Sequence, residues 1–343
     1  MTAVSPWFDK GRHEDRRGRL LVRNRIQTAY RKWFEGEGFL EVDVPALAVS
    51  PGNEAHLHGF STTIIHNDGS GSPLYLHTSP EFACKKLLAA GEEKIFFLGH
   101  VFRNRERTRT HAPEFTMVEW YRVHAPYRQI IDDTLAMVRC AADVAAKQTW
   151  QWNNKTCDMR AEAELLSVQD AFLRHAGVDL LSTLRIDGTP DRDALARIST
   201  VSFAEDESWS DIFSRILVER VEPHLGGGKL TVLFEYPAVE AALARVCSHD
   251  ARVAERFELY AAGVELANGF GELTDADEQR RRFEEEMVIK QRVYGERYPI
   301  DEELLQALAM MPEASGVALG FDRVVMLATG ATSIDQVQWA PVT

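Results

Sequence analysis

The chain has 343 residues, of which 45% are hydrophobic and 27% charged, as in soluble globular proteins with one large domain or two ordinary ones. Its longest apolar stretches, such as residues 95–102, fall short of the ~20 residues that span a bilayer, and the N-terminus has no apolar signal core, so we expect a cytoplasmic protein without a membrane partner. The net charge of -13 disfavours a protein that grips long nucleic acid through its overall field. Four cysteines without C-x-x-C spacing argue against a zinc site or a disulfide framework.

The first half of the chain alternates helices and strands. Apolar spacing predicts a helix over 17–36, and FLEVDV (39–44) predicts a strand that Pro45 ends. After a strand at 74–77, Ser79 and Pro80 form an N-cap and a first-turn proline, so Glu81 begins a helix that runs to Gly91. Residues 95–103 and 114–123 read as the two strands of a hairpin with a long connection.

The second half begins with a mixed region, 125–225, which we interpret as a variable helical insertion with helical pieces near 127–146 and 205–221. Strands are predicted over 229–236 and on both sides of Ala262 and Gly263. A charged helix over 275–295, a shorter helix opened by Asp301, and a strand that enters a helix over 315–330 complete the chain. Hairpins mixed with helices, without βαβ alternation, predict an α+β fold with a mostly antiparallel sheet flanked by helices.

The hairpin connection concentrates cations in an acidic chain. Arg103, Arg105, Arg107 and Arg109 lie within seven positions, and His111 follows them. A solvated charge cluster is one interpretation. The other is a phosphate site, because guanidinium groups held between two apolar strands can bind a polyphosphate.

Three carboxylates, Glu258, Glu265 and Glu272, are spaced by seven within 256–272. They can be exposed acids on strand edges. Glu265, however, lies between apolar neighbours, and a carboxylate within a sheet is costly without a cation, so Mg²⁺ on a nucleotide or a substrate ammonium is the alternative. The glycine-flanked GVALGFDR (316–323) puts Arg323 at a helix start, where anions are favoured, although no Walker A or G-x-G-x-x-G pattern accompanies it.

Taken in order, these segments resemble the catalytic domain of class II aminoacyl-tRNA synthetases, and among them the lysyl type. GFLEVDVPAL (38–47) resembles motif 1, FRNRERTRTHAPEFTMVEWY (102–121) motif 2 and GVALGFDR motif 3, while TSPE (78–81) and ELANGFGELTDA (265–276) are similar to lysyl substrate signatures. The resemblance begins near Arg23 and implies one catalytic domain over about 17–343. It also implies a homodimer formed through motif 1.

The resemblance implies ATP and Mg²⁺ as cofactors. Arg103 would contact the α-phosphate and the substrate carboxylate, and Arg103 and Arg323 would carry catalysis. Glu258 and Glu265 would bind Mg²⁺. The full set expected to bind ATP is Arg103, Asn104, Arg105, Arg109, His111, Glu265, Leu266, Gly320 and Arg323.

For the amino acid, the resemblance implies that Glu81 and Glu119 face the backbone-side amine and that Tyr121 and Glu272 take the distal ammonium. The full expected set is Ser79, Pro80, Glu81, Glu119, Tyr121, Asn268, Phe270, Glu272 and Ala318. The chain departs from the family pattern in three places. Arg105 replaces the usual Glu, so adenine recognition shifts to Glu106 or to backbone; Ala112 replaces Asn; Val44 replaces Thr.

Within the family, the chain looks most like shortened lysyl paralogues that attach lysine or β-lysine to a lysine of elongation factor P. Only about twenty residues precede the first predicted helix, too few for an OB-fold anticodon domain, which makes tRNA an unexpected partner. Ala318, where tRNA-charging lysyl enzymes usually have Gly, agrees with this. The alternatives are a tRNA-charging enzyme and a non-catalytic regulatory paralogue, although intact Arg103, Glu265 and Arg323 disfavour the latter.

Overall fold

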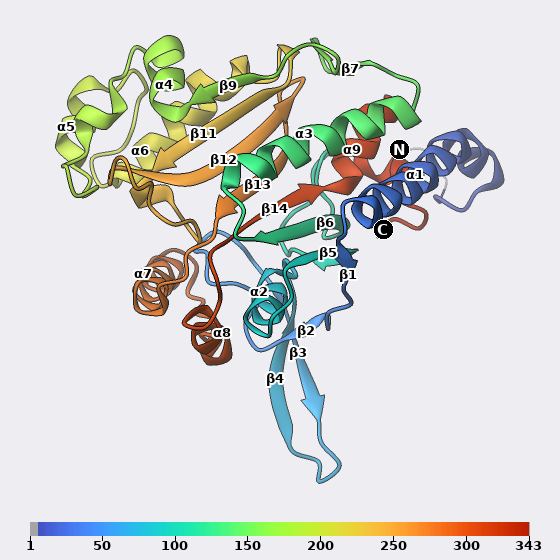
Figure 1. Ribbon diagram of the computed structural model, residues 1–343, viewed down its shortest axis with the longest axis horizontal. Helices are drawn as coiled ribbons and strands as arrows, with labels where there is room; N and C mark the ends of the chain where they lie inside the picture. The colour runs from blue at the N-terminus through green and yellow to red at the C-terminus, as the bar shows by residue number, and fades with distance from the viewer. Residues whose placement is uncertain (1–5, 343) are drawn as a thin grey trace.

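The structure is a computed structural model that describes residues 6–342, and an eight-stranded sheet forms its centre (Figure 1). The neighbouring pairs from β5 to β11 are antiparallel, and only the edge pairs β1–β5 and β9–β11 are parallel. The predicted α+β fold with a mostly antiparallel sheet is confirmed. The order across the sheet is β1 (Leu40–Glu41), β5 (Lys94–Phe102), β6 (Glu114–Val123), β14 (Ala314–Gly320), β13 (Val264–Gly271), β12 (Val253–Ala261), β11 (Thr231–Pro237) and β9 (Glu164–Ser167).

One face of the sheet is covered by three helices, α1 (Lys10–Gly36), α3 (Tyr127–Val144) and α9 (Phe321–Thr329) (Figure 1). Successive strand residues point to opposite faces, so Phe96 and Trp120 belong to this core. Phe34 of α1 stacks on Phe96 with ring centroids 4.2 Å apart. This packing fixes β5, β6 and β14 as a rigid platform.

The opposite face carries α2 (Glu81–Ala89), and a second core joins it to α7 (Ala276–Tyr294) and α8 (Glu302–Leu308). Phe97 and Tyr121, the sequence neighbours of Phe96 and Trp120, point to this side. The start of α2 follows from sequence as predicted, because the Ser79 hydroxyl accepts a hydrogen bond from the backbone N–H of Glu81 at 3.0 Å. Cys84 and Leu88 of α2 are buried in this second core.

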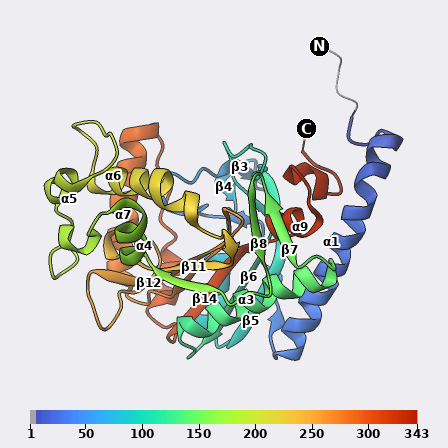
Figure 2. The same cartoon turned by 90° about the horizontal axis from the view of Figure 1, so that it is seen from above.

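Residues 166–225 form a smaller core of their own beside β11. It contains α4 (Val168–Ala176), α5 (Arg192–Ile198) and α6 (Trp209–Ile216), and Figure 2 shows these helices at the end of the molecule away from α1. Stacked rings of Phe172, Trp209 and Phe213 hold it together. Part of the predicted insertion lies elsewhere: α3 packs in the main core and β9 pairs with β11.

The remaining strands form two small sheets. The β3–β4 hairpin, drawn at the lower end of Figure 1, projects from the body. The small sheets are β2 (Leu47–Ala48), β4 (Gly71–Leu76) and β3 (Phe60–Ile65), and β10 (Gly228–Lys229), β8 (Lys155–Asp158) and β7 (Thr149–Trp152). Short 3-10 or π segments occupy Leu180–Thr183, Leu217–Val221, Glu222–His224, Ala238–Glu240 and Ile334–Val337. None of the helices within residues 6–342 has the length and apolarity needed to cross a membrane.

Two predicted boundaries were wrong. The first helix begins at Lys10 rather than at 17, because Asp9 caps it by accepting a hydrogen bond from the backbone N–H of Arg12. The strand predicted over 39–44 pairs only at Leu40–Glu41, because the chain then leaves β5 toward Pro45. The predicted hairpin (β5 and β6), the two strands joined at Ala262 and Gly263, and α7, α8 and α9 are confirmed.

Candidate active site

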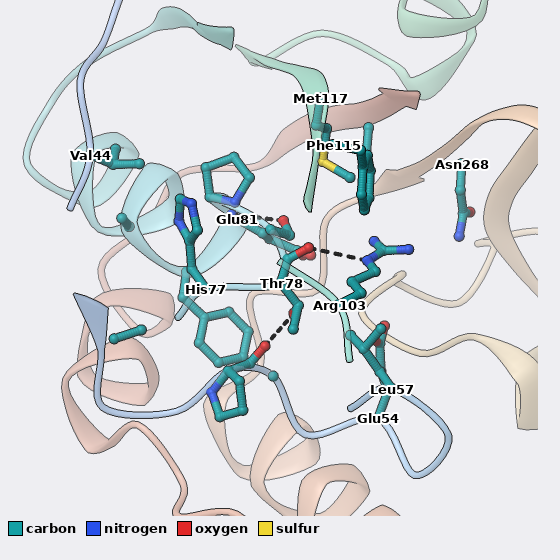
Figure 3. Close-up of a pocket in the computed structure, with 18 of the residues that line it drawn as sticks. Val44, Glu54, Leu57, His77, Thr78, Glu81, Arg103, Phe115, Met117 and Asn268 are labelled. Atoms are coloured by element: carbon teal, nitrogen blue, oxygen red, sulfur yellow. Dashed lines mark hydrogen bonds between the residues drawn. The ribbon is translucent and has the colours of Figure 1, made fainter. Parts of the chain in front are cut away.

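A cavity of about 550 Å³ lies on the face of the sheet that carries α2 (Figure 3). Its walls come from the loop 43–57, the start of α2, the connection between β5 and β6, the strands β13 and β14, and the start of α9. Many of the residues selected from sequence therefore meet in one place. Those that line it are Ser79, Pro80, Glu81, Arg103, His111, Glu265, Leu266, Asn268, Phe270, Ala318, Gly320 and Arg323.

The arginine cluster divides into residues that line the cavity and residues that do not. Arg105 forms an ion pair with Glu296 and lies over the ring of Tyr294, 5.4 Å from its centroid. Arg109 donates to the carbonyl of Thr332 at 3.0 Å and lies over Trp152. Asn104 is also outside the cavity lining, whereas Glu106 belongs to it.

Arg103 is the cation most open to an anion in this cavity. Its Nε donates to the carbonyl of Thr78 at 3.2 Å, and its guanidinium lies 5.4 Å from the ring centroid of Phe115 (Figure 3). Among residues 6–342, no carboxylate oxygen lies within 4.0 Å of its guanidinium nitrogens. The guanidinium group of Arg103 is therefore held in position without a carboxylate in direct contact, as the binding of a phosphate or carboxylate requires.

Arg323 is held by four groups at once, one of which is the carbonyl of Thr110, to which its Nε donates at 3.3 Å. It donates to the carbonyl of Glu265 at 2.9 Å, to the Glu265 carboxylate at 3.3 Å and to His111 Nε2 at 2.6 Å. Burial and the charges of Arg323 and Arg103 lower the pKa of His111 to about 4. Because guanidinium only donates, the neutral His111 accepts this bond and orients Arg323 without competing for an anion.

The neighbouring residue fixes the helix that carries Arg323. Asp322 is buried and forms an ion pair with Arg23 of α1. It also accepts from the backbone N–H of Thr116 at 3.2 Å and from Gln338 at 2.9 Å. The Asp-Arg pair of motif 3 thus has two roles: the acid anchors α9 and the arginine points into the cavity.

Glu265 and Glu258 are the carboxylates available to a metal ion. The side chain of Glu265 is 40% exposed, toward the cavity, and burial of its carboxyl group together with the charge of Glu258 raises its pKa, with Arg323 acting against this. Glu258 lies behind it and accepts from Arg256 at 2.8 Å and from the hydroxyl of Tyr260 at 2.6 Å. A carboxylate has four lone pairs, so each residue keeps an acceptor position of the kind that Mg²⁺ prefers; of the two, Glu265 lines the cavity and Glu258 does not.

Three further carboxylates, Glu81, Glu119 and Glu272, cluster near the start of α2. Glu119 is buried and accepts from the hydroxyls of Ser79, at 2.8 Å, and Tyr121. Burial and the charge of Glu81 raise the pKa of Glu119 to about 8. Glu119, Tyr121 and Glu272 do not line the cavity as the side chains stand, whereas Glu81 does.

A cation that sequence reasoning missed joins these carboxylates. Lys85 Nζ lies 2.7 Å from Glu81 and 2.7 Å from Glu272, and its side chain is 1% exposed. The only sequence signal was the i, i+4 spacing of Glu81 and Lys85, which is typical of an exposed helix pair. Its second partner, Glu272, comes from the end of β13.

The floor of the cavity includes Ala318 and Asn268, which are register partners in the sheet. Ala318 of β14 pairs with Asn268 of β13 on one side and with Glu119 of β6 on the other. The Oδ1 atom of Asn268 is buried and has no hydrogen-bond partner among residues 6–342. An unsatisfied acceptor beside carboxylates favours a ligand that donates hydrogen bonds, such as an ammonium group.

The loop over the cavity is tied down by a second lysine missed from sequence. Lys290 of α7 is buried and donates to the carbonyl oxygens of Ala55, at 2.9 Å, and Leu57, at 2.6 Å. The backbone N–H of Ala55 donates to Glu286 of the same helix at 2.8 Å. This loop carries Glu54, which Figure 3 shows beside Arg103.

These features define a nucleotide-activating site of the synthetase type, and the chain belongs to the class II tRNA synthetases: the family model for "tRNA synthetases class II (D, K and N)" matches residues 3–343. The names of curated relatives are more specific about the reaction than the family description. A protein of Yersinia enterocolitica serotype O:8 / biotype 1B is 40% identical over 326 residues, 94% of each chain. Proteins of Salmonella paratyphi A and Salmonella typhi are 42% identical over 321 residues, 93% of each chain. All three are named elongation factor P (R)-beta-lysine ligase.

Proposed function

We propose that this chain activates (R)-β-lysine or lysine with ATP and transfers it to a lysine side chain of elongation factor P. The observation that carries the proposal is that an unneutralised arginine, Arg103, lies in the same cavity as Glu81 and Asn268. A phosphate or carboxylate can bind at one end and ammonium groups at the other. The names of the relatives support elongation factor P as acceptor and β-lysine as substrate.

In the first half-reaction, the carboxylate of the amino acid attacks the α-phosphorus of ATP and pyrophosphate leaves. No protein nucleophile is required, so the side chains align the reactants and stabilise charge. Arg103 holds the α-phosphate and the substrate carboxylate, and Arg323, oriented by His111, holds the outer phosphates. Glu258 and Glu265 would hold Mg²⁺, which would neutralise charge on the polyphosphate.

In the second half-reaction, an amine of the acceptor protein attacks the carbonyl carbon of the adenylate. An amide forms, AMP leaves and the amine loses a proton. A free lysine has a pKa of about 10.4, so only about one molecule per thousand or fewer is neutral at pH 7. The site therefore has to favour the neutral amine, and we assign its proton to Glu54 at the cavity wall, because burial and the charge of Glu81 raise the pKa of this carboxyl group.

Two properties of the assembly complete the proposal. The protein acts as a homodimer, because the motif 1 segment exposes the apolar side chains of Leu40, Leu47 and Val49. It acts in the cytoplasm, where ATP and translation factors are available. The alternative acceptor is tRNA, and the experiment below compares it with elongation factor P.

The experiment is pyrophosphate–ATP exchange with lysine or (R)-β-lysine, followed by intact mass measurement of elongation factor P or tRNA as acceptor. Arg103→Ala removes a charge-assisted contact worth about 2 to 4 kcal/mol in the transition state, a loss of roughly 30- to 1,000-fold in exchange. Arg107→Ala is the matched control, because Arg107 is exposed and donates to the backbone of Val342. Normal exchange by Arg103→Ala, or charging of tRNA alone, would contradict the proposal.

A further inference from the structure

Lys85 occupies the centre of the acid cluster and is sealed from solvent. Its Nζ lies 2.7 Å from Glu81 Oε1 and 2.7 Å from Glu272 Oε2, and the side chains of Lys85 and Glu272 are each 1% exposed. Burial by itself lowers the pKa of a lysine, but the charges of Glu272 and Glu81 outweigh it and raise the pKa of Lys85. Lys85 is therefore a permanent internal cation.

Other charged groups also face this cluster, among them Glu54 of the cavity wall, whose pKa is raised by burial and by the charge of Glu81. Glu119 faces it from β6, with its oxygens bound by Ser79 and Tyr121. Arg245, from the segment before β12, acts on Glu272 at longer range, but its own partners are Glu255 at 2.7 Å and Glu313. Cys84 of α2 is buried, and burial raises the pKa of its thiol, so it stays neutral.

The charge balance of the cluster follows from these contacts. Glu81, Glu119 and Glu272 contribute three negative charges when ionised, and Lys85 returns one positive charge. Two negative charges remain. Lysine and β-lysine each bring two ammonium groups, while their carboxylate is left for Arg103.

We propose that Lys85 is a positioning residue that keeps Glu272 able to ionise when a ligand binds, so that the cluster reaches two net negative charges in the complex and the site selects an amino acid with two ammonium groups. This inference rests on the proposed function. The inference goes beyond the proposed function because it assigns the preference for a diammonium substrate to a residue that the substrate need not touch.

The protonation of the acids explains how Lys85 acts. Burial raises the pKa of Glu272 to about 7, and the charge of Lys85 prevents a larger rise in this pKa. Without Lys85, the pKa of Glu272 rises and the group is a neutral acid at pH 7, which binds an ammonium poorly. An amino acid with one ammonium group leaves one buried charge uncompensated, which is unfavourable.

The decisive variant is Lys85→Met, compared with Lys85→Arg and with Lys86→Met. Lys86 is the next residue of α2, is 31% exposed and pairs with Asp301 at 2.8 Å, outside the cluster, so its replacement controls for loss of a cation from the same helix. The readout is KM for (R)-β-lysine, for lysine and for ATP in pyrophosphate exchange between pH 6 and 9.

Lys85→Met should raise KM for both lysine isomers roughly tenfold or more at pH 7, with KM for ATP nearly unchanged. The loss should shrink as pH rises, because Glu272 then ionises without help from Lys85. Lys85→Arg should restore most of the affinity, and Lys86→Met should keep the wild-type pH profile. A pH-independent loss would mean a merely structural role, and a wild-type KM would mean no role.

A measurement on the wild-type protein keeps the inference testable if Lys85→Met does not fold. Two ammonium groups lower the pKa values of Glu119 and Glu272, so binding of (R)-β-lysine at pH 7 should release about one proton, counted by calorimetry in two buffers of different ionisation enthalpy. No proton release would overturn the inference. If wild-type protein shows no exchange with either isomer, the proposed function fails; if exchange is normal and Lys85→Met matches wild type, only this inference fails.

Discussion

Gly316 of β14 lies directly opposite Tyr121 of β6, and the tyrosine ring covers the space where a side chain would begin. A Cβ at Gly316 would lie 2.4 Å from two ring carbons of Tyr121 and 2.7 Å from Glu272 Oε1. Only glycine permits this approach. The missing side chain lets the Tyr121 hydroxyl reach Glu119 while Glu272 stays on Lys85.

Gly316→Ala should therefore damage the acid cluster without touching the nucleotide side. Overpacking a close-packed site costs about 1–3 kcal/mol of unfolding free energy, and displacement of Tyr121 and Glu272 should raise KM for the amino acid more than KM for ATP. Urea unfolding and exchange kinetics measure the two effects. Gly36→Ala is the control, because a Cβ there meets nothing within 4 Å. Equal stability of the two variants would refute the packing argument.

Local sequence signals were sufficient for much of this fold. Ser79 and Pro80 predicted the start of α2 at Glu81, and the apolar runs on either side of the arginine cluster predicted the β5–β6 hairpin. In each case the deciding interaction joins residues close in the chain. For the site, the family motifs were the sufficient signal, because they identified Glu81, Arg103 and Arg323 as a set.

Long-range partners could not be predicted in the same way. Lys85 is buried against Glu272 from a distant strand, whereas its spacing from Glu81 alone is typical of an exposed helix pair. Arg105 and Arg109 belong to the predicted cation cluster. Outside the cavity lining, however, Arg105 pairs with Glu296 and Arg109 lies over the ring of Trp152. The parallel pairing of β9 with β11 is non-local and only four residues long.

The pH dependence of stability should report on Glu119. Its pKa is raised to about 8, above the value of about 4.3 in an unfolded chain. The folded state therefore binds the extra proton, and the resulting stability is fully present below about pH 4.3 and is lost as pH rises through about 8. Unfolding free energy of the ligand-free protein should fall between pH 6 and 9. Glu119→Gln should flatten this slope; an unchanged slope would assign it to other groups.

The proposed dimer can be tested at Leu40. This side chain is 53% exposed on β1, and Leu47 and Val49, further along the same stretch of chain, are exposed too. A charge buried without a partner in an interface is unfavourable, so Leu40→Asp should shift the protein toward monomer. Sedimentation at micromolar concentration distinguishes the states. Ile186→Asp, at a 91% exposed position of the insertion, should leave assembly unchanged. Monomeric wild-type protein would contradict the proposal.

Ala318 is the residue through which the cavity floor can distinguish the two lysine isomers. Its strand partners are Asn268, with an unsatisfied oxygen, and Glu119, the expected ligand of the backbone-side amine. With the amine bound to Glu119 as proposed, the methyl group of Ala318 would lie next to it. A β-amino acid carries its amine one carbon further along the chain, so the same methyl group obstructs α-lysine more than β-lysine.

Ala318→Gly should consequently raise the activation of α-lysine relative to (R)-β-lysine. One methyl-sized steric change is worth roughly 1–3 kcal/mol, so the ratio of kcat/KM values for the two isomers should move about 5- to 150-fold toward α-lysine. KM for ATP serves as the internal control, because Arg103 and Arg323 are unaffected. The variant also removes the methyl group without adding polar atoms, so a change in affinity for both isomers alike would indicate altered packing. A ratio equal to that of the wild type would rule out the steric account, and the preference would then have to come from Glu119 and Ser79.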